Sequence, residues 1–144
     1  PYIGPCQVIT VDIPAGTRVK ACDIKTPITA QRVLIKTSSC PDYRIFNEDF
    51  CALDPSLIEA LAEQDVILVG IDTPSVDRFD DKILLPHNAI YKANLSILEG
   101  IVLGEVEDGE YILVAPPLPI VGADASPVRA LLLTSQAYPY LASL

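Results

Sequence analysis

The chain has 144 residues and a mass of 15.5 kDa, the size of one domain with a substantial core. Half of its residues are hydrophobic and its mean hydropathy is +0.36, which argues against a disordered chain. A net charge of −9 gives no basic surface for nucleic acid, and no apolar run reaches the roughly 20 residues of a membrane span. We therefore expect a cytoplasmic protein without nucleic-acid or membrane partners.

The cysteines and the opening residues bear on the state of the chain. Cys6, Cys22, Cys40 and Cys51 each stand alone in the sequence, whereas metal clusters and redox motifs need close pairs. We expect reduced, mostly buried thiols. The chain opens at Pro1 and leads straight into an apolar run, so we expect it to be part of a longer protein.

The first half of the chain alternates strand-like runs with turns. β-Branched residues in 6–13 predict a strand that ends at Pro14. Pro27 is expected to open a short helical turn. Residues 32–37, with the sequence RVLIKT, predict a second strand, and residues 42–52 predict a loop.

A helix and a buried strand follow. Asp54 is a capping residue and Pro55 suits the first helical position, so a helix is predicted to start there and end near residues 64–65. The apolar run 66–71 predicts a strand buried on both faces, which is typical of α/β proteins. Strand, helix and strand in this order indicate a crossover unit.

The second half predicts a mixed α/β fold with several strands and few helices. The elements expected are a loop at residues 74–81, helical turns at 87–93, an acidic turn at 105–110 whose Asp108-Gly109 pair resembles a hairpin turn, strands at 111–115 and 128–134, and a tail at 135–144.

His87, the only histidine, and Glu99, set in an apolar run, are candidate ligands for zinc or a similar divalent metal. Structural zinc needs four protein ligands and catalytic zinc usually three, so the pair alone is a partial signal. A lone histidine is more often structural or incidental. Glu99 can instead lie at a strand edge or pair with Arg129 or a lysine, because a buried carboxylate needs a partner.

Asp72 and Ser75 follow the buried run 66–71, at the carboxyl end of a strand, where α/β proteins place functional residues. The alternative is a turn in which Asp72 bonds backbone amides. A serine hydrolase using Ser75 and His87 is disfavoured because the sequence has no GxSxG motif. No phosphate-binding loop is present either.

At these residues the sequence resembles the metal-dependent cyclase-like hydrolases, in particular their kynurenine formamidase branch. The likeness lies in GIDTPSVD at residues 70–77, in His87 and Glu99 twelve positions apart, and in DASPVRALL at residues 124–132. It implies a mixed-sheet, swivelling β/α-type fold. Residues 1–144 would then form a single domain, the carboxyl-terminal two-thirds of a cyclase-like hydrolase.

The resemblance also implies an activity: metal-dependent hydrolysis of an aryl formamide, N-formyl-L-kynurenine, to kynurenine and formate. His87 and Glu99 would hold a divalent metal, expected to be a zinc pair, and Asp72 and Ser75 would contact substrate or orient the ligands. The family's His-x-Gly-Thr-His-x-Asp-x-Pro-x-His segment, which supplies the other ligands and the acid–base histidine, is not in this sequence.

We therefore expect no catalytic residue in this chain, a possible separate amino-terminal fragment, and a homodimer, which would use the excess apolar surface. Two alternatives remain. One is a related cyclase-like hydrolase that acts on another amide or lactam. The other is a non-catalytic binding subunit that lacks the metal motif.

Overall fold

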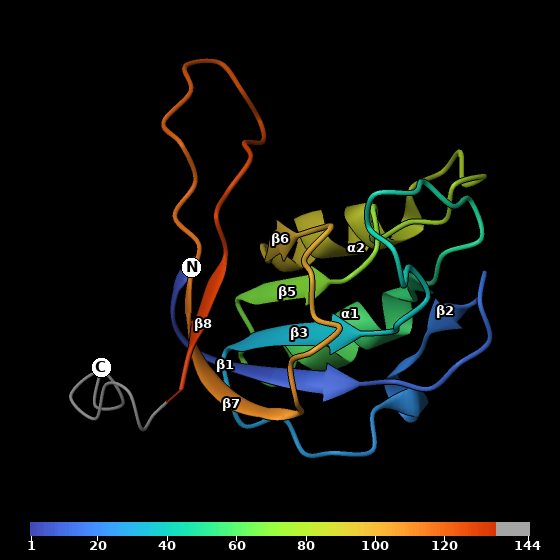
Figure 1. The fold of residues 1–144 in the computed structure, drawn as a ribbon, viewed down its shortest axis with the longest axis horizontal. Helices are drawn as coiled ribbons and strands as arrows, with labels where there is room; N and C mark the ends of the chain where they lie inside the picture. The colour runs from blue at the N-terminus through green and yellow to red at the C-terminus, as the bar shows by residue number, and fades with distance from the viewer. Residues whose placement is uncertain (135–144) are drawn as a thin grey trace.

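The computed structural model describes residues 1–134, so the predicted tail at residues 135–144 lies outside the described part. Its centre is a mixed sheet of six strands in the order β6-β5-β3-β1-β7-β8, with a second sheet of β2 and β4 (Figure 1). The elements are β1 (Ile3–Thr10), β2 (Arg18–Val19), the 3₁₀ helix η1 (Ala21–Asp23), β3 (Arg32–Lys36), β4 (Ala52–Leu53), α1 (Pro55–Ala62), β5 (Leu68–Ile71), α2 (Leu85–Ala93), β6 (Ser96–Leu98), β7 (Gly109–Val114) and β8 (Leu131–Leu133). The predicted α/β class is confirmed.

Strands β1, β3, β5 and β6 run parallel, and β7 and β8 add an antiparallel edge. Helix α1 lies between β3 and β5 in the sequence, and these strands pair in parallel, as the predicted crossover requires. Helix α2 likewise connects β5 to the parallel strand β6. All four residues of β5 are buried, because the strand lies inside the sheet with side chains packed on both faces.

Helix α1 follows from its sequence. The Asp54 side chain accepts a hydrogen bond from the backbone N–H of Ser56 at 3.0 Å, and Pro55 occupies the first turn, where its missing N–H costs nothing. Leu57, Ile58 and Leu61 are buried against the sheet. Full burial of each such side chain stabilises the fold by about 1.5–3 kcal/mol.

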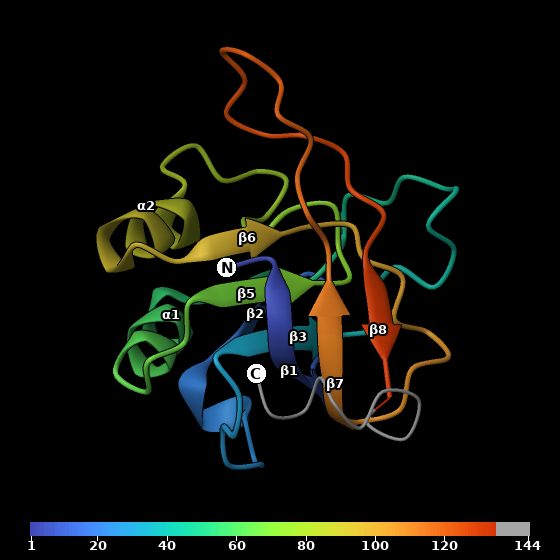
Figure 2. The ribbon, with the colours of Figure 1, turned by 90° about the vertical axis from the view of Figure 1, so that its left-hand side faces the viewer.

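The two faces of the main sheet pack against different elements. Both helices lie on one face (Figure 2). On this face Leu61 of α1 and Ile90 of α2 belong to one hydrophobic cluster with side chains of the sheet. Loop residues such as Leu103 cover the other face together with the chain leading into β8. The connection between β7 and β8 projects from the body of the molecule in both views (Figure 1 and Figure 2).

The predicted hairpin at residues 105–110 is wrong. Strands β6 and β7, on either side of this turn, are separated in the sheet by β5, β3 and β1. The Asp108 carboxylate instead accepts hydrogen bonds from the backbone N–H of Thr10, at 2.9 and 3.0 Å, and from its hydroxyl. The acidic turn therefore fixes the end of β1.

The predicted helical turn at Pro27 is also wrong. The side-chain amide of Gln7 donates to the carbonyl of Pro27 at 3.0 Å and accepts from the N–H of Thr29 at 2.9 Å. These backbone groups are engaged by a buried side chain of β1, so the segment has no need of helical hydrogen bonds. Strand β1 itself starts at Ile3 and ends at Thr10, ahead of the predicted bounds.

The four cysteines are free thiols in the structure, and the prediction that most of them are buried is wrong. Only Cys6 and Cys51 are buried, whereas Cys22 is exposed and Cys40 is intermediate. Burial raises the pKa of the Cys6 thiol to about 12, which leaves it inert at neutral pH. None of the helices in the described part of the chain is long and apolar enough to cross a membrane.

Candidate metal site

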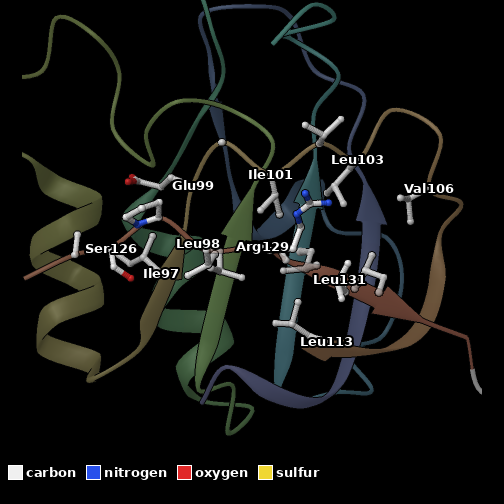
Figure 3. A pocket seen from close by; sticks show the side chains of 18 of the residues that line it. Ile97, Leu98, Glu99, Ile101, Leu103, Val106, Leu113, Ser126, Arg129 and Leu131 are labelled. Atoms are coloured by element: carbon white, nitrogen blue, oxygen red, sulfur yellow. The ribbon is translucent and has the colours of Figure 1, made fainter. Parts of the chain in front are cut away.

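A cleft of about 1040 Å³ opens on the sheet face opposite the helices. Most of its wall residues lie at the end of β6, in the loop that follows it, and in the chain that leads into and includes β8 (Figure 3). Leu34 of β3, Leu113 of β7 and His87 of α2 complete the lining. Most of the lining is aliphatic, with Leu98, Ile101 and Leu103 on the sheet side. A largely apolar cleft with few polar groups is the usual form of a small-molecule site.

The two predicted ligands meet at this cleft. His87 lies in the first turn of α2, directly after Pro86, and Glu99 follows the last residue of β6. His87 Nε2 is 3.8 Å from Glu99 Oε1, and both residues line the cleft. Their side chains are 38% and 32% exposed, so both remain reachable from solvent.

The other ring nitrogen of His87 is engaged by a residue that the sequence did not single out. His87 Nδ1 is hydrogen-bonded to the carboxylate of Asp77, whose side chain is 2% exposed. The guanidinium of Arg18 lies 3.9 Å from the second Asp77 oxygen and also pairs with Asp81. Only the position of Asp77 at the end of the GIDTPSVD stretch hinted at a role, and nothing in its spacing predicted burial.

Glu99 is held by the backbone. Its Oε1 accepts a hydrogen bond from the N–H of Val76 at 2.8 Å. The next residue, Gly100, has a φ of +64°, which glycine adopts readily, and its N–H donates to the carbonyl of Thr73 at 2.8 Å. Among the ion pairs of residues 1–134, none joins Glu99 to Arg129 or to a lysine, so that alternative is not realised.

Asp72 and Ser75 both serve the loops around β5. The Asp72 carboxylate accepts from the N–H and hydroxyl of Thr37 and from the N–H of Ser38, at 2.8–3.0 Å, which ties the end of β5 to the turn after β3. The Ser75 hydroxyl accepts from the N–H of Asp77 at 3.1 Å. These contacts agree with the alternative in which Asp72 bonds backbone amides in a turn. The amides that Asp72 bonds belong to the segment after the neighbouring strand β3. A contact with substrate stays a prediction.

The chemistry of the donors suits a metal, but their number falls short. An imidazole nitrogen and a carboxylate oxygen are ordinary ligands of zinc and related ions. Within residues 1–134, no group of three or more His, Cys, Asp or Glu side chains is arranged to hold a metal ion. His87 and Glu99 therefore fit part of a metal site, and a complete one needs further ligands.

Comparisons with known proteins identify the relatives of this chain. No family model matches it. It is 44% identical over 134 residues to a kynurenine formamidase of Sphingopyxis alaskensis and 40% identical over 138 residues to that of Bordetella petrii. Each match covers 92% of this chain and 64% of the relative, so the chain spans less than two-thirds of these proteins.

A solved structure agrees with the sequence relatives. A protein described as a potential metal-dependent hydrolase with cyclase activity superposes with a TM-score of 0.81 at 30% identity, over 91% of this chain and 65% of that one. Sequence and fold thus point the same way. The chain is a homologue of the kynurenine formamidases over 64% of their length and has the fold of the cyclase-like metal-dependent hydrolases.

Proposed function

We propose that this chain supplies part of the metal site and the substrate cleft of an arylformamidase-type hydrolase, which converts N-formyl-L-kynurenine to kynurenine and formate. One observation carries the proposal: in a homologue of kynurenine formamidases, His87 Nε2 and Glu99 Oε1 lie 3.8 Å apart at the edge of an apolar cleft. Both side chains are partly exposed, so their unpaired ring nitrogen and carboxylate oxygen can reach a ligand in the cleft.

The ligand roles follow from the contacts. His87 offers Nε2, because its Nδ1 is bonded to Asp77. Glu99 is oriented by the Val76 amide, which leaves its second oxygen for a ligand. We propose that the metal is a pair of zinc ions. A bound divalent metal lowers the pKa of its water toward about 7 and polarises a carbonyl oxygen.

The cleft suits an aryl substrate with a carboxylate. Leu98, Ile101 and Leu103 form an apolar wall for a flat ring. Arg129 is the one lysine or arginine among the cleft residues of the described chain, and it points into the cleft between the aliphatic side chains (Figure 3). A guanidinium there can bind the amino-acid carboxylate of N-formylkynurenine.

The remaining parts of the site have to come from elsewhere. Departure of the aniline nitrogen needs a proton donor, and His87 is committed to metal in this proposal. We therefore place the acid–base histidine and the other metal ligands in a segment that precedes this chain, joined to it or bound as a separate fragment. The homodimer and the cytoplasmic location stay predictions.

An activity assay tests this proposal. The complete polypeptide encoded by the gene is stripped of metal and supplied with zinc, and the release of kynurenine is measured. Zinc-dependent release from N-formylkynurenine is expected, with little or none from residues 1–144 alone. A panel of other amides and lactams separates the related hydrolases. If the polypeptide hydrolyses a lactam but not N-formylkynurenine, the proposed reaction class stands and the proposed substrate is wrong.

A non-catalytic binding subunit is the second candidate, favoured by the lack of a third metal ligand in the described residues. The coding sequence distinguishes it from the hydrolase. An initiator codon directly before Pro1, with no partner chain carrying histidine ligands, would support the binding subunit. An upstream in-frame histidine motif would exclude it.

A further inference from the structure

One short turn contacts both candidate metal ligands. In the turn formed by residues 75–77, the N–H of Val76 donates to Glu99 at 2.8 Å, and the carboxylate of Asp77 bonds His87 Nδ1. The turn is fixed in two further ways: the N–H of Asp77 donates to Ser75, and the carbonyl of Val76 accepts from the N–H of Leu53 at 2.8 Å. Its position therefore sets the directions of both ligands.

Asp77 is an unusual member of this turn, because it is an acidic residue whose side chain is only 2% exposed. Its Oδ1 has no hydrogen-bond partner among the described residues, and removing a charge from water without compensation is costly. The nearest compensation is the guanidinium of Arg18 at 3.9 Å. Arg18 is itself fixed by the carbonyl of Leu53 at 2.8 Å and by Asp81.

The hydrogen bond to Asp77 has a chemical consequence for His87. A carboxylate only accepts hydrogen bonds, so the neutral imidazole has to carry its proton on Nδ1. The lone pair is then on Nε2, the nitrogen that faces Glu99 across 3.8 Å. Carboxylates that hold the second nitrogen of a metal-binding histidine in this way fix both its tautomer and its ring orientation.

We propose that Asp77 is a positioning residue: held by Arg18, it keeps His87 in the Nδ1–H tautomer with Nε2 directed toward the Glu99 side of the cleft. What Nε2 binds rests on the proposed function. The tautomer of His87 does not depend on the proposed function, so an experiment can refute either one without the other.

The tautomer can be measured directly, because His87 is the only histidine in the chain. Nitrogen NMR of the ¹⁵N-histidine-labelled 144-residue chain under alkaline conditions therefore reports on this ring alone. We expect a protonated Nδ1. In Asp77→Asn an amide N–H₂ can donate to Nδ1, so the Nε2–H form should become the major one.

Asp80→Asn is the matched control, because Asp80 lies in the same loop but is exposed and paired with Arg78. It should leave the tautomer unchanged. A protonated Nε2 in the unaltered chain would overturn the inference, whether or not Asp77→Asn folds. So would an unchanged tautomer in folded Asp77→Asn.

Metal affinity supplies the second readout. In the complete polypeptide, Asp77→Asn should weaken Co²⁺ binding by roughly 10- to 100-fold, the usual effect of removing such a partner. Asp77→Asn combined with His87→Ala should bind no more weakly than His87→Ala alone, because Asp77 acts through that ring. If the two substitutions lower the Co²⁺ affinity additively, Asp77 affects metal binding by a route other than His87. No Co²⁺ binding by the unaltered polypeptide, together with a protonated Nδ1, would refute the proposed metal site and leave the positioning of His87 standing.

Discussion

The two faces of the six-stranded sheet differ in how they are covered and in what they contribute. On one face lie α1 and α2 (Figure 2), whose side chains, such as Leu57, Leu61 and Ile90, pack into one hydrophobic cluster with the strands. On the other, loops and the chain before β8 cover the strands only in part and leave the cleft. His87 and Glu99 lie where the faces meet, beside the edge strand β6. Stability should therefore depend on the helical face, and ligand binding on the cleft and its edge.

The largest effect is expected at that edge. His87→Ala in the complete polypeptide should lower kynurenine release by at least about 10³-fold, because the metal loses a ligand. The free energy of unfolding should also fall, by about 1–3 kcal/mol, because the buried Asp77 carboxylate loses its hydrogen bond to the ring. Steady-state kinetics and urea unfolding measure the two quantities. Tyr91→Ala, at an 86% exposed position of the same helix, is the control and should alter neither.

Core truncation on the helical face should act mainly on stability. Leu61 is 1% exposed, so Leu61→Ala should lower the free energy of unfolding by about 2–5 kcal/mol through lost burial and a cavity. Leu118 is 54% exposed in the connection between β7 and β8, so Leu118→Ala should cost about 0.5 kcal/mol or less. Equal losses in urea unfolding would mean that the faces contribute alike.

A smaller effect is expected inside the cleft. Arg129→Gln should raise KM for N-formylkynurenine roughly 10-fold with kcat nearly unchanged, because a binding contact far from the reacting bond is lost. The comparison substrate is a formanilide without a carboxylate, for which KM should not change. A fall in kcat with KM unchanged would place Arg129 in the chemical step instead.

The smallest effect concerns the cap of α1. Asp54→Ala should cost about 1 kcal/mol at neutral pH. Burial acts to raise the pKa of Asp54, but the hydrogen bonds from Ser56 and the charges of Lys20 and Arg18 outweigh it, so the pKa is lowered from 3.8. The contribution is thus present above the unfolded pKa and is lost as pH falls through the lower folded value. Urea unfolding should show the difference between the two proteins shrinking in acid, and a difference that grows there would contradict this sign.

Local signals predicted the helical face well. The start of α1 at Asp54-Pro55 and the buried strand β5 depend on neighbouring residues, and both are confirmed. The hairpin failed because strand pairing is not local: β7 pairs with β1, from the far end of the sequence. The Pro27 turn failed for the same reason, since Gln7 of β1 bonds that segment.

In the candidate site, too, some residues could be predicted from the sequence and others could not. His87 and Glu99 were recognisable by residue type, as a lone histidine and a carboxylate in an apolar run, and the structure brings them together. Asp77 was not, because its burial depends on Arg18, which comes from β2 and is distant in sequence. Residue type shows which side chains can bind a metal, whereas only the fold shows which side chain orients them.

The central claim is that His87 and Glu99 hold a metal at the cleft edge, and metal retention tests it most directly. The complete polypeptide would be loaded with zinc, dialysed and analysed for zinc per chain, unaltered and with His87→Ala and Glu99→Ala combined. Retention of about one to two zinc ions by the unaltered polypeptide, and a loss of at least one in the double variant, is the expected result. Equal zinc in both would contradict the claim.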